Sequence, residues 1–142
     1  MRRRPRLVVD TNVLVSALLW QGTPGRLIER IGDQELHLFT SRALFDELDS
    51  VLHRKKLAKS VAATGLSADT MLANVRKLAT LVTTRQLTAQ ISRDADDDAV
   101  LACALAARAD LIVSGDDDLL VLGHFENIPI ITANQALAVM IG

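Results

Sequence analysis

The 142-residue sequence has a single cysteine, Cys103, and no run of about 18 uninterrupted apolar residues. One cysteine excludes a disulfide bond within the chain and is typical of a reducing compartment. The missing apolar run excludes a membrane-spanning helix. The basic start, residues 1–6, leads into an apolar stretch that Asp10 and Asn12 interrupt, so we expect no secretion signal. We therefore expect a cytoplasmic protein.

The sequence also lacks an excess of either charge, with 16 Lys and Arg against 17 Asp and Glu. This balance neither demands nor excludes an anionic partner such as nucleic acid. A phosphate-binding glycine loop, a Cys-x-x-Cys pair and a His-Glu-x-x-His helix are all missing. The three histidines are scattered without ligand spacing, and we interpret them as surface or hydrogen-bonded residues.

The chain is 49% hydrophobic, and we expect one domain over residues 1–142 that buries roughly 70% of its unfolded surface. Short β-branched runs alternate with helical segments, which predicts an α/β fold with a mostly parallel central sheet and helices on both faces. The expected strands are 7–9, 36–40, 111–113 and 128–131. The expected helices are 13–20, 24–31, 41–52, one that begins after Ser67, one from Asp96 or Asp97 to about Ala107, a short turn over 117–122 and one that begins at Thr132 or Asn134.

Two segments have open interpretations. Apolar residues at helical spacing after Ser67 predict a core-facing stripe that includes Leu81 and Val82, although residues 82–84 are an alternative start of a strand. The basic runs at residues 2–6 and 54–59 are either ordinary surface or contacts to phosphate groups.

Four acidic residues are predicted to meet at one edge of the sheet, where ligands of parallel α/β sheets bind. Asp10 directly follows the first strand, and Asp116 follows the strand 111–113. Glu47 lies in the helix that leaves the second strand. Asp98 lies in the first turn of a helix that runs antiparallel to the sheet, so its start is expected at the same edge.

Each acid also has a structural interpretation. Asp10 is a possible helix cap. Asp98 is expected on the core side of its helix because Leu101 and Leu105 are expected on the same face, where an unpaired carboxylate is costly. The neighbouring acids are interpreted mainly as caps or turn residues, with assistance to the site left open: Asp94, Asp96, Asp97, Asp117 and Asp118.

Clustered carboxylates need a cation. Two unit negative charges about 4 Å apart repel by roughly 4 kcal/mol at an effective dielectric near 20. Oxygen ligands without histidine or thiolate favour Mg²⁺ or Mn²⁺ over zinc. Because such an ion is completed by phosphate oxygens and activates water, the pattern indicates hydrolysis of phosphodiester bonds.

Four motifs in this order resemble those of the PIN-domain ribonucleases, and within them the VapC-like toxins of prokaryotic toxin-antitoxin systems. Each motif is weak alone, but the four together cover nearly the whole chain. They are Leu7-Val8-Val9-Asp10-Thr11-Asn12-Val13-Leu14, residues 41–48 with Val51-Leu52, residues 93–102 and residues 111–120.

This resemblance implies a three-layer α/β/α fold and a metal-dependent endoribonuclease that uses Mg²⁺ or Mn²⁺. Family members often dimerise, and an antitoxin segment inhibits the toxins. By position, Asp10, Glu47, Asp98 and Asp116 match the family's acidic quartet. Asn12 and Ser114 match its supporting polar positions, although threonine is common where this chain has Ser114.

Three alternatives stay open beside a toxin. Some PIN proteins process RNA without an antitoxin. An aspartate-nucleophile phosphatase is disfavoured because Asn12 stands where such enzymes resembling haloacid dehalogenases carry a second aspartate. A non-catalytic RNA-binding module is disfavoured because all four acids are present.

Overall fold

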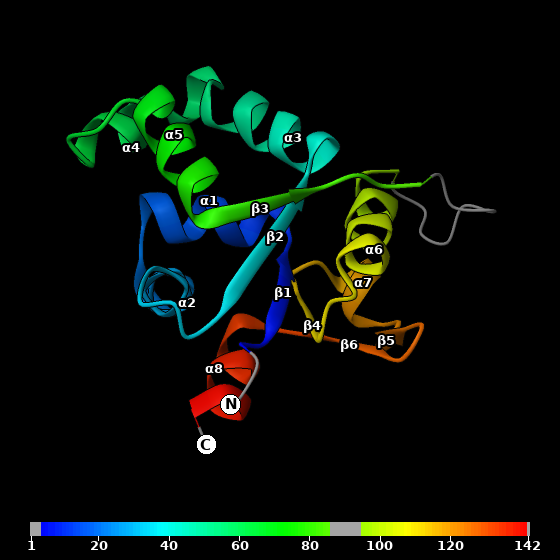
Figure 1. Cartoon of the computed structure of the whole chain (residues 1–142). Helices are drawn as coiled ribbons and strands as arrows, with labels where there is room; N and C mark the ends of the chain where they lie inside the picture. Colours follow the sequence, from blue (N-terminus) through cyan, green and yellow to red (C-terminus); the bar gives the residue numbers. More distant parts are fainter. Residues whose placement is uncertain (1–3, 86–94, 142) are drawn as a thin grey trace.

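The computed structural model describes residues 4–85 and 95–141, which form one sheet with helices on both faces (Figure 1). In chain order the elements are β1 (Arg6–Val9), α1 (Thr11–Leu19), α2 (Gly22–Gly32), β2 (His37–Ser41), α3 (Arg42–Leu52), η1 (Lys55–Leu57), α4 (Ala58–Ala63), α5 (Ala68–Leu78), β3 (Ala79–Val82), α6 (Ala95–Ala107), β4 (Leu111–Val113), α7 (Asp117–Leu120), β5 (His124–Phe125), β6 (Ile128–Ile131) and α8 (Ala133–Ile141).

The sheet has the strand order β3-β2-β1-β4-β6-β5. All neighbouring pairs are parallel except β5 and β6, which form a short antiparallel pair. The first strand therefore lies in the interior, with β2 on one side and β4 on the other. The expected mostly parallel α/β sheet is confirmed, and β5 is a strand that the sequence pattern did not predict.

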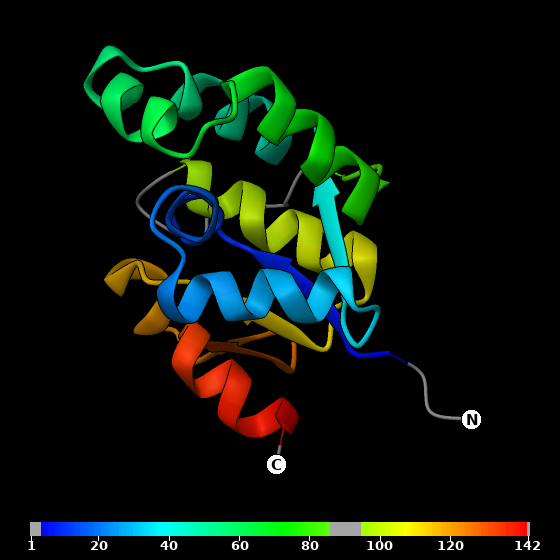
Figure 2. The ribbon, with the colours of Figure 1, turned by 90° about the vertical axis from the view of Figure 1, so that its left-hand side faces the viewer.

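Side-chain alternation along the strands gives the sheet two buried faces. Leu7 lies opposite Leu38 and Leu111 in the register, and these residues share one cluster with α1, α2 and α8. Val8 points to the other face and shares a cluster with residues of α6 and α7. Figure 1 shows α1 and α2 on one side of the strands and α6 and α7 on the other, and in Figure 2 helix α2 lies in front of the strands. The three-layer α/β/α arrangement is confirmed.

Helix α6 buries one side and exposes the other. Val100, Leu101 and Ala104 are almost fully buried, whereas Leu105 is 40% exposed. Cys103 is also fully buried, as a small side chain of this apolar helix. Burial raises the pKa of its thiol to about 12, so the thiol is neutral at physiological pH.

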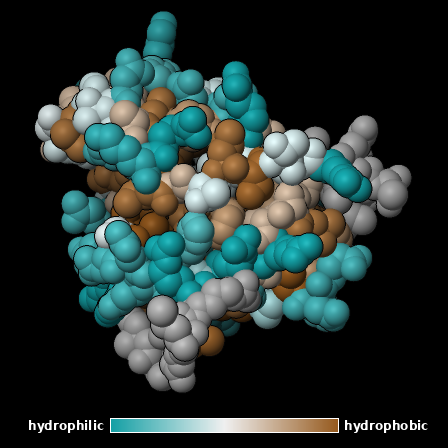
Figure 3. Space-filling model, viewed as in Figure 1, coloured by the Kyte–Doolittle hydropathy of each residue, from teal (hydrophilic) through white to brown (hydrophobic). Residues whose placement is uncertain are grey.

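The helix after Ser67 is shorter than expected. Helix α5 ends at Leu78, and the next four residues form β3, which pairs in parallel with β2. Leu81 is therefore a residue of an edge strand and is 43% exposed, so its placement in a helical core stripe was wrong. The β-branched residues Thr80 and Val82 explain the change, since they favour an extended strand. In Figure 3, which has the same view as Figure 1, hydrophobic side chains gather across the middle of the molecule.

None of the helices in the described part of the chain combines the length and apolar character that crossing a membrane requires.

The buried face of α6 leads to a stability prediction. Leu101→Ala removes a fully buried side chain, and we expect a loss of about 2 to 5 kcal/mol in the free energy of unfolding. The control on the same helix is Leu105→Ala, for which we expect a change below about 1 kcal/mol because the side chain is 40% exposed. Urea unfolding measures both. Equal losses would contradict this orientation of α6.

Candidate metal centre

Asp10 continues the line of β1 beyond its last strand residue. Its backbone N–H donates to the Val113 carbonyl oxygen at 2.8 Å, which extends the pairing of β1 with β4 by one step. Asp10 occupies the N-cap position of α1, but its side chain makes no capping hydrogen bond to that helix. The residue is buried, with 6% of its surface exposed. The interpretation of this side chain as a helix cap is therefore wrong.

Ser114 connects the ends of β1 and β4. It is fully buried, and its Oγ donates to Asp10 Oδ2 at 2.8 Å. The same Oγ accepts a hydrogen bond from the Asp116 backbone N–H at 2.9 Å. The hydroxyl thus orients the Asp10 carboxylate and fixes the turn that carries Asp116.

Asp116 is the N-cap residue of the short helix α7. Its Oδ1 accepts a hydrogen bond from the backbone N–H of Asp118 at 2.8 Å, which caps that helix. Asp117 and Asp118 form the first turn of α7. The side chain of Asp116 is half-buried and lies at the same edge of the sheet as Asp10. One carboxylate therefore both caps a helix and faces the site.

Three carboxylates meet at this edge. Asp10, Asp97 and Asp116 each offer an oxygen, and these oxygens lie within 4.8 Å of one another. They come from the end of β1, the first turn of α6 and the loop after β4. Asp10 and Asp97 are buried, with 6% and 3% of their surface exposed. At 4.8 Å, two such charges repel by roughly 3 kcal/mol at an effective dielectric near 20.

The structure brings Asp10 and Asp116 of the four predicted acids into this group, and it adds Asp97. Asp98 and Glu47 are half-buried, and among the described residues they are not members of the group. Successive residues of a helix point about 100° apart, so Asp97 and Asp98 face different directions. Asp97 lies on the stripe of Val100, Leu101 and Ala104, which is the buried face of α6.

The remaining acids of this motif lie partly outside the described structure. Asp94 lies outside the described residues, and the side chain of Asp96 is also not described. The sequence could have singled out Asp97 through its spacing of three, four and seven residues from Val100, Leu101 and Ala104. The sequence did not single out this spacing, because α6 carries its own alanine and leucine residues on nearly every side of the helix.

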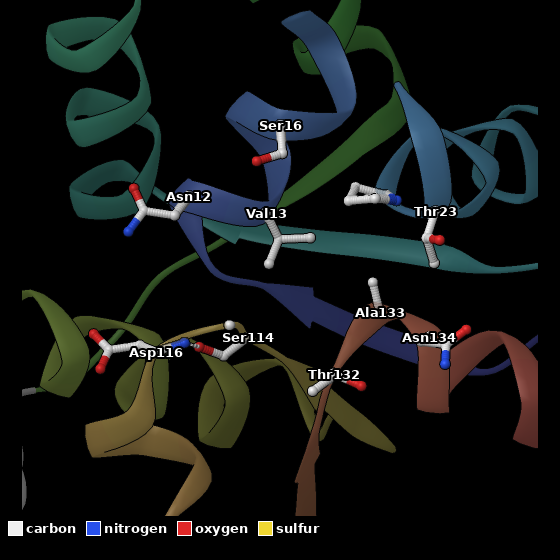
Figure 4. Close-up of a pocket in the computed structure, with 11 residues that line it drawn as sticks. Asn12, Val13, Ser16, Thr23, Ser114, Asp116, Thr132, Ala133 and Asn134 are labelled. Atoms are coloured by element: carbon white, nitrogen blue, oxygen red, sulfur yellow. Dashed lines mark hydrogen bonds between the residues drawn. The ribbon is translucent and has the colours of Figure 1, made fainter. Parts of the chain in front are cut away.

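A pocket of about 390 Å³ opens beside the acidic group (Figure 4). Asn12, Ser114 and Asp116 line the end of the pocket that adjoins the carboxylates. Of the two predicted supporting residues, Asn12 is exposed at the start of α1, whereas Ser114 is fully buried.

These residues fit a hard divalent cation. All three donors are carboxylate oxygens, which Mg²⁺ and Mn²⁺ prefer. Oxygens bound to one Mg²⁺ at about 2.1 Å lie at most about 4.2 Å apart. The observed spacing of up to 4.8 Å exceeds this limit by about 0.6 Å, so binding of one ion would need only a small movement of the carboxylates.

Arg6 lies at the opposite end of β1 from Asp10. Its Nε donates to the Ala107 carbonyl oxygen at 2.8 Å, and its guanidinium lies 4.2 Å from the centre of the Phe39 ring. Arg6 therefore fastens α6 to the sheet away from the acidic group. The second basic run, residues 54–59, lies on exposed η1 and α4, and its role in phosphate contact stays a prediction.

The histidines lie outside the acidic group. His37 Nε2 is 2.7 Å from Thr80 Oγ1, and partial burial lowers the pKa of His37. A hydrogen bond to the Asp49 backbone raises the pKa of His53, and the carboxylates of Asp49 and Asp69 add to this effect. The interpretation of these two residues as surface or hydrogen-bonded histidines is confirmed.

The fold and the buried acidic group define an α/β protein with a candidate metal site at the carboxyl edge of its sheet. The protein-family profile described as "PIN domain" matches residues 6–118, which include β1, α6 and the loop after β4. The chain belongs to the PIN domain family, whose members are generally nucleases.

Two solved structures are similar to this chain. A chain of the crystal structure of VapBC2 from Rickettsia felis, bound to a DNA fragment from their promoter, has 12% sequence identity and a TM-score of 0.58. The alignment covers 88% of this chain and 96% of that chain. The PIN domain of RRP44 from T. brucei has 15% identity and a TM-score of 0.48, over 96% of this chain and 81% of that chain. A search of curated proteins gives no match.

The hydrogen bonds of Ser114 give a prediction for the metal-free protein. Ser114→Ala removes the donor to Asp10 and the acceptor for Asp116 in a fully buried position. We expect a loss of about 1 to 3 kcal/mol in the free energy of unfolding, measured with urea in EDTA.

The control is Ser50→Ala on the exposed side of α3, for which we expect a change within about 0.5 kcal/mol. If Ser114→Ala is as stable as the control, the hydroxyl does not hold the two ends together.

Proposed function

We propose that the protein is a metal-dependent endoribonuclease that hydrolyses RNA phosphodiester bonds and acts as the toxin of a toxin-antitoxin pair. The observation that carries this proposal is the convergence of Asp10, Asp97 and Asp116, two of them buried, with their oxygens within 4.8 Å. Burial of like charges at this spacing is costly without a cation. Membership of the PIN domain family supports the nuclease activity.

In this proposal Asp10, Asp97 and Asp116 hold Mg²⁺ or Mn²⁺. An ion held by these three carboxylates would supply positive charge opposite the phosphate and would make water more acidic. Ser114 holds Asp10 in place through its hydroxyl, and the Asp118 backbone N–H holds Asp116. These two hydrogen bonds fix the carboxylates before substrate arrives, so little reorganisation is needed during the reaction.

Glu47 and Asp98 stay candidates for further ligands or for positioning water, as the family pattern implies. Both are half-buried and lie on α3 and α6, which start at the carboxyl edge of the sheet. Asn12 is proposed to contact substrate, because it lines the pocket next to Asp116.

The proposed partners are an RNA substrate, a cognate antitoxin and a second copy of the chain. The similarity to a chain from a VapBC2 structure favours an antitoxin partner over none, although an RNA-processing nuclease is the alternative. Co-purification with the product of an adjacent small open reading frame would favour a toxin. Light scattering of the purified protein would test the homodimer.

Variants of the adjacent residues Asp97 and Asp98 test which of the two carboxylates binds the ion. We expect Asp97→Asn to lower kcat/KM for RNA cleavage by about 100-fold or more, because it removes a charge from the ion-binding group. The matched comparison is Asp98→Asn, for which we expect a loss of activity at least about 10-fold smaller than that of Asp97→Asn, because Asp98 is not a member of the group among the described residues. The measurement is cleavage of a fluorescent RNA at saturating Mn²⁺. Loss of activity in Asp98→Asn alone would return the ligand role to Asp98.

Metal binding also has a readout that does not depend on activity. We expect Mn²⁺ to raise the melting temperature of the wild-type protein, since a ligand that binds the folded state stabilises it. Asp10→Asn should reduce this shift. Cleavage that is equally fast in EDTA, or an unchanged melting temperature with Mn²⁺, would show that the proposed metal mechanism is wrong.

A further inference from the structure

We propose that the pocket beside the acidic group binds the base of the nucleotide next to the cleaved bond and selects which base is accepted. This inference rests on the proposed ribonuclease activity and extends it to sequence preference. The pocket has a volume of about 390 Å³, within the range of small-molecule sites. It shares Asp116 with the acidic group, so an RNA strand that passes the carboxylates also passes the pocket.

The pocket has two chemically different ends. Asn12, Ser114 and Asp116 form the end at the carboxylates, while Thr23 and Asn134 lie at the other end (Figure 4). Between them the side chains of Val13 and Ala133 form an apolar middle. Along the pocket, the polar residues of the far end are followed by the apolar middle and then by the acidic group.

This order suits a nucleobase better than a second phosphate. Among the described residues that line the pocket, none is Lys or Arg, and the one charged side chain is Asp116. A phosphate in the pocket would therefore face a negative carboxylate without a cationic side chain. A base is neutral, packs its flat face on apolar groups and offers hydrogen-bonding groups at its edge. Thr23 and Asn134 can donate to or accept from such an edge.

The residues at the far end are held by regular structure. Thr23 lies in the first turn of α2, and Asn134 lies in the first turn of α8. Thr132 and Gln135 bond reciprocally at the start of α8, with N–H to side-chain oxygen distances of 3.0 and 3.2 Å. A hydroxyl and an amide on such helix starts keep a fixed spacing, which selection between bases requires.

The main test is the base preference of cleavage. The wild-type protein, Thr23→Val and Asn134→Leu are incubated with an RNA library of random sequence, and the cleaved ends are sequenced. We expect the preference at one position next to the cut to fall by about 10-fold or more in both variants, because each removes hydrogen-bonding groups. The matched control is Asn74→Leu on the exposed side of α5, which should keep the wild-type preference.

A binding experiment separates the pocket from the proposed activity. Uridine, cytidine, adenosine and guanosine are titrated into the protein in EDTA while backbone amide signals are followed by NMR. We expect saturable shifts of Thr23 and Asn134 with at least one nucleoside, and none with ribose alone. Asn74→Leu should bind equally well because Asn74 does not line the pocket.

The outcomes distinguish the two proposals. RNA cleavage with an unchanged base preference in both pocket variants would overturn this inference and leave the ribonuclease proposal intact. Nucleoside binding in the pocket without any RNA cleavage would overturn the ribonuclease proposal and leave a nucleoside site. Altered preference in the pocket variants, together with an unaltered Asn74→Leu, supports the inference.

Discussion

The arrangement of this protein depends on a buried carboxylate, Asp10, at the end of an interior strand. This strand, β1, pairs with β2 and β4 and is covered on both faces, so the residue at its carboxyl end is buried. The Ser114 hydroxyl meets this charge at 2.8 Å, and the same hydroxyl orders the turn of Asp116. The Ser114 side chain therefore links the ends of β1 and β4 and contacts both Asp10 and Asp116. The third carboxylate, that of Asp97, belongs to α6.

Much of this arrangement follows from local sequence patterns. Asp10 and Asp116 each follow a short apolar run, and the rule that parallel strands present their carboxyl ends at one edge places them together. The right-handed crossover likewise places the start of α6 there. Local patterns do not give the pairing between distant residues: β3 pairs in parallel with β2, and the short strand β5 pairs with β6.

The choice between Asp97 and Asp98 shows where sequence reasoning stops. A helix with apolar residues all around gives no direction for its buried side, and the sequence places Leu101 and Leu105 on the side of Asp98. Packing against the sheet buries Val100, Leu101 and Ala104 and leaves Leu105 40% exposed. A rotation of about one residue on α6 therefore decides which carboxylate joins Asp10 and Asp116. Tertiary contacts, rather than composition, set that rotation.

The central claim is that Asp10, Asp97 and Asp116 together form a site for one hard divalent ion. A crystal structure of the protein soaked in Mn²⁺, with the ion located by its anomalous scattering, tests this claim most directly. The account predicts an anomalous peak bonded to oxygens of all three carboxylates. A peak held by Asp98 without Asp97, or no peak at this edge of the sheet, would contradict it.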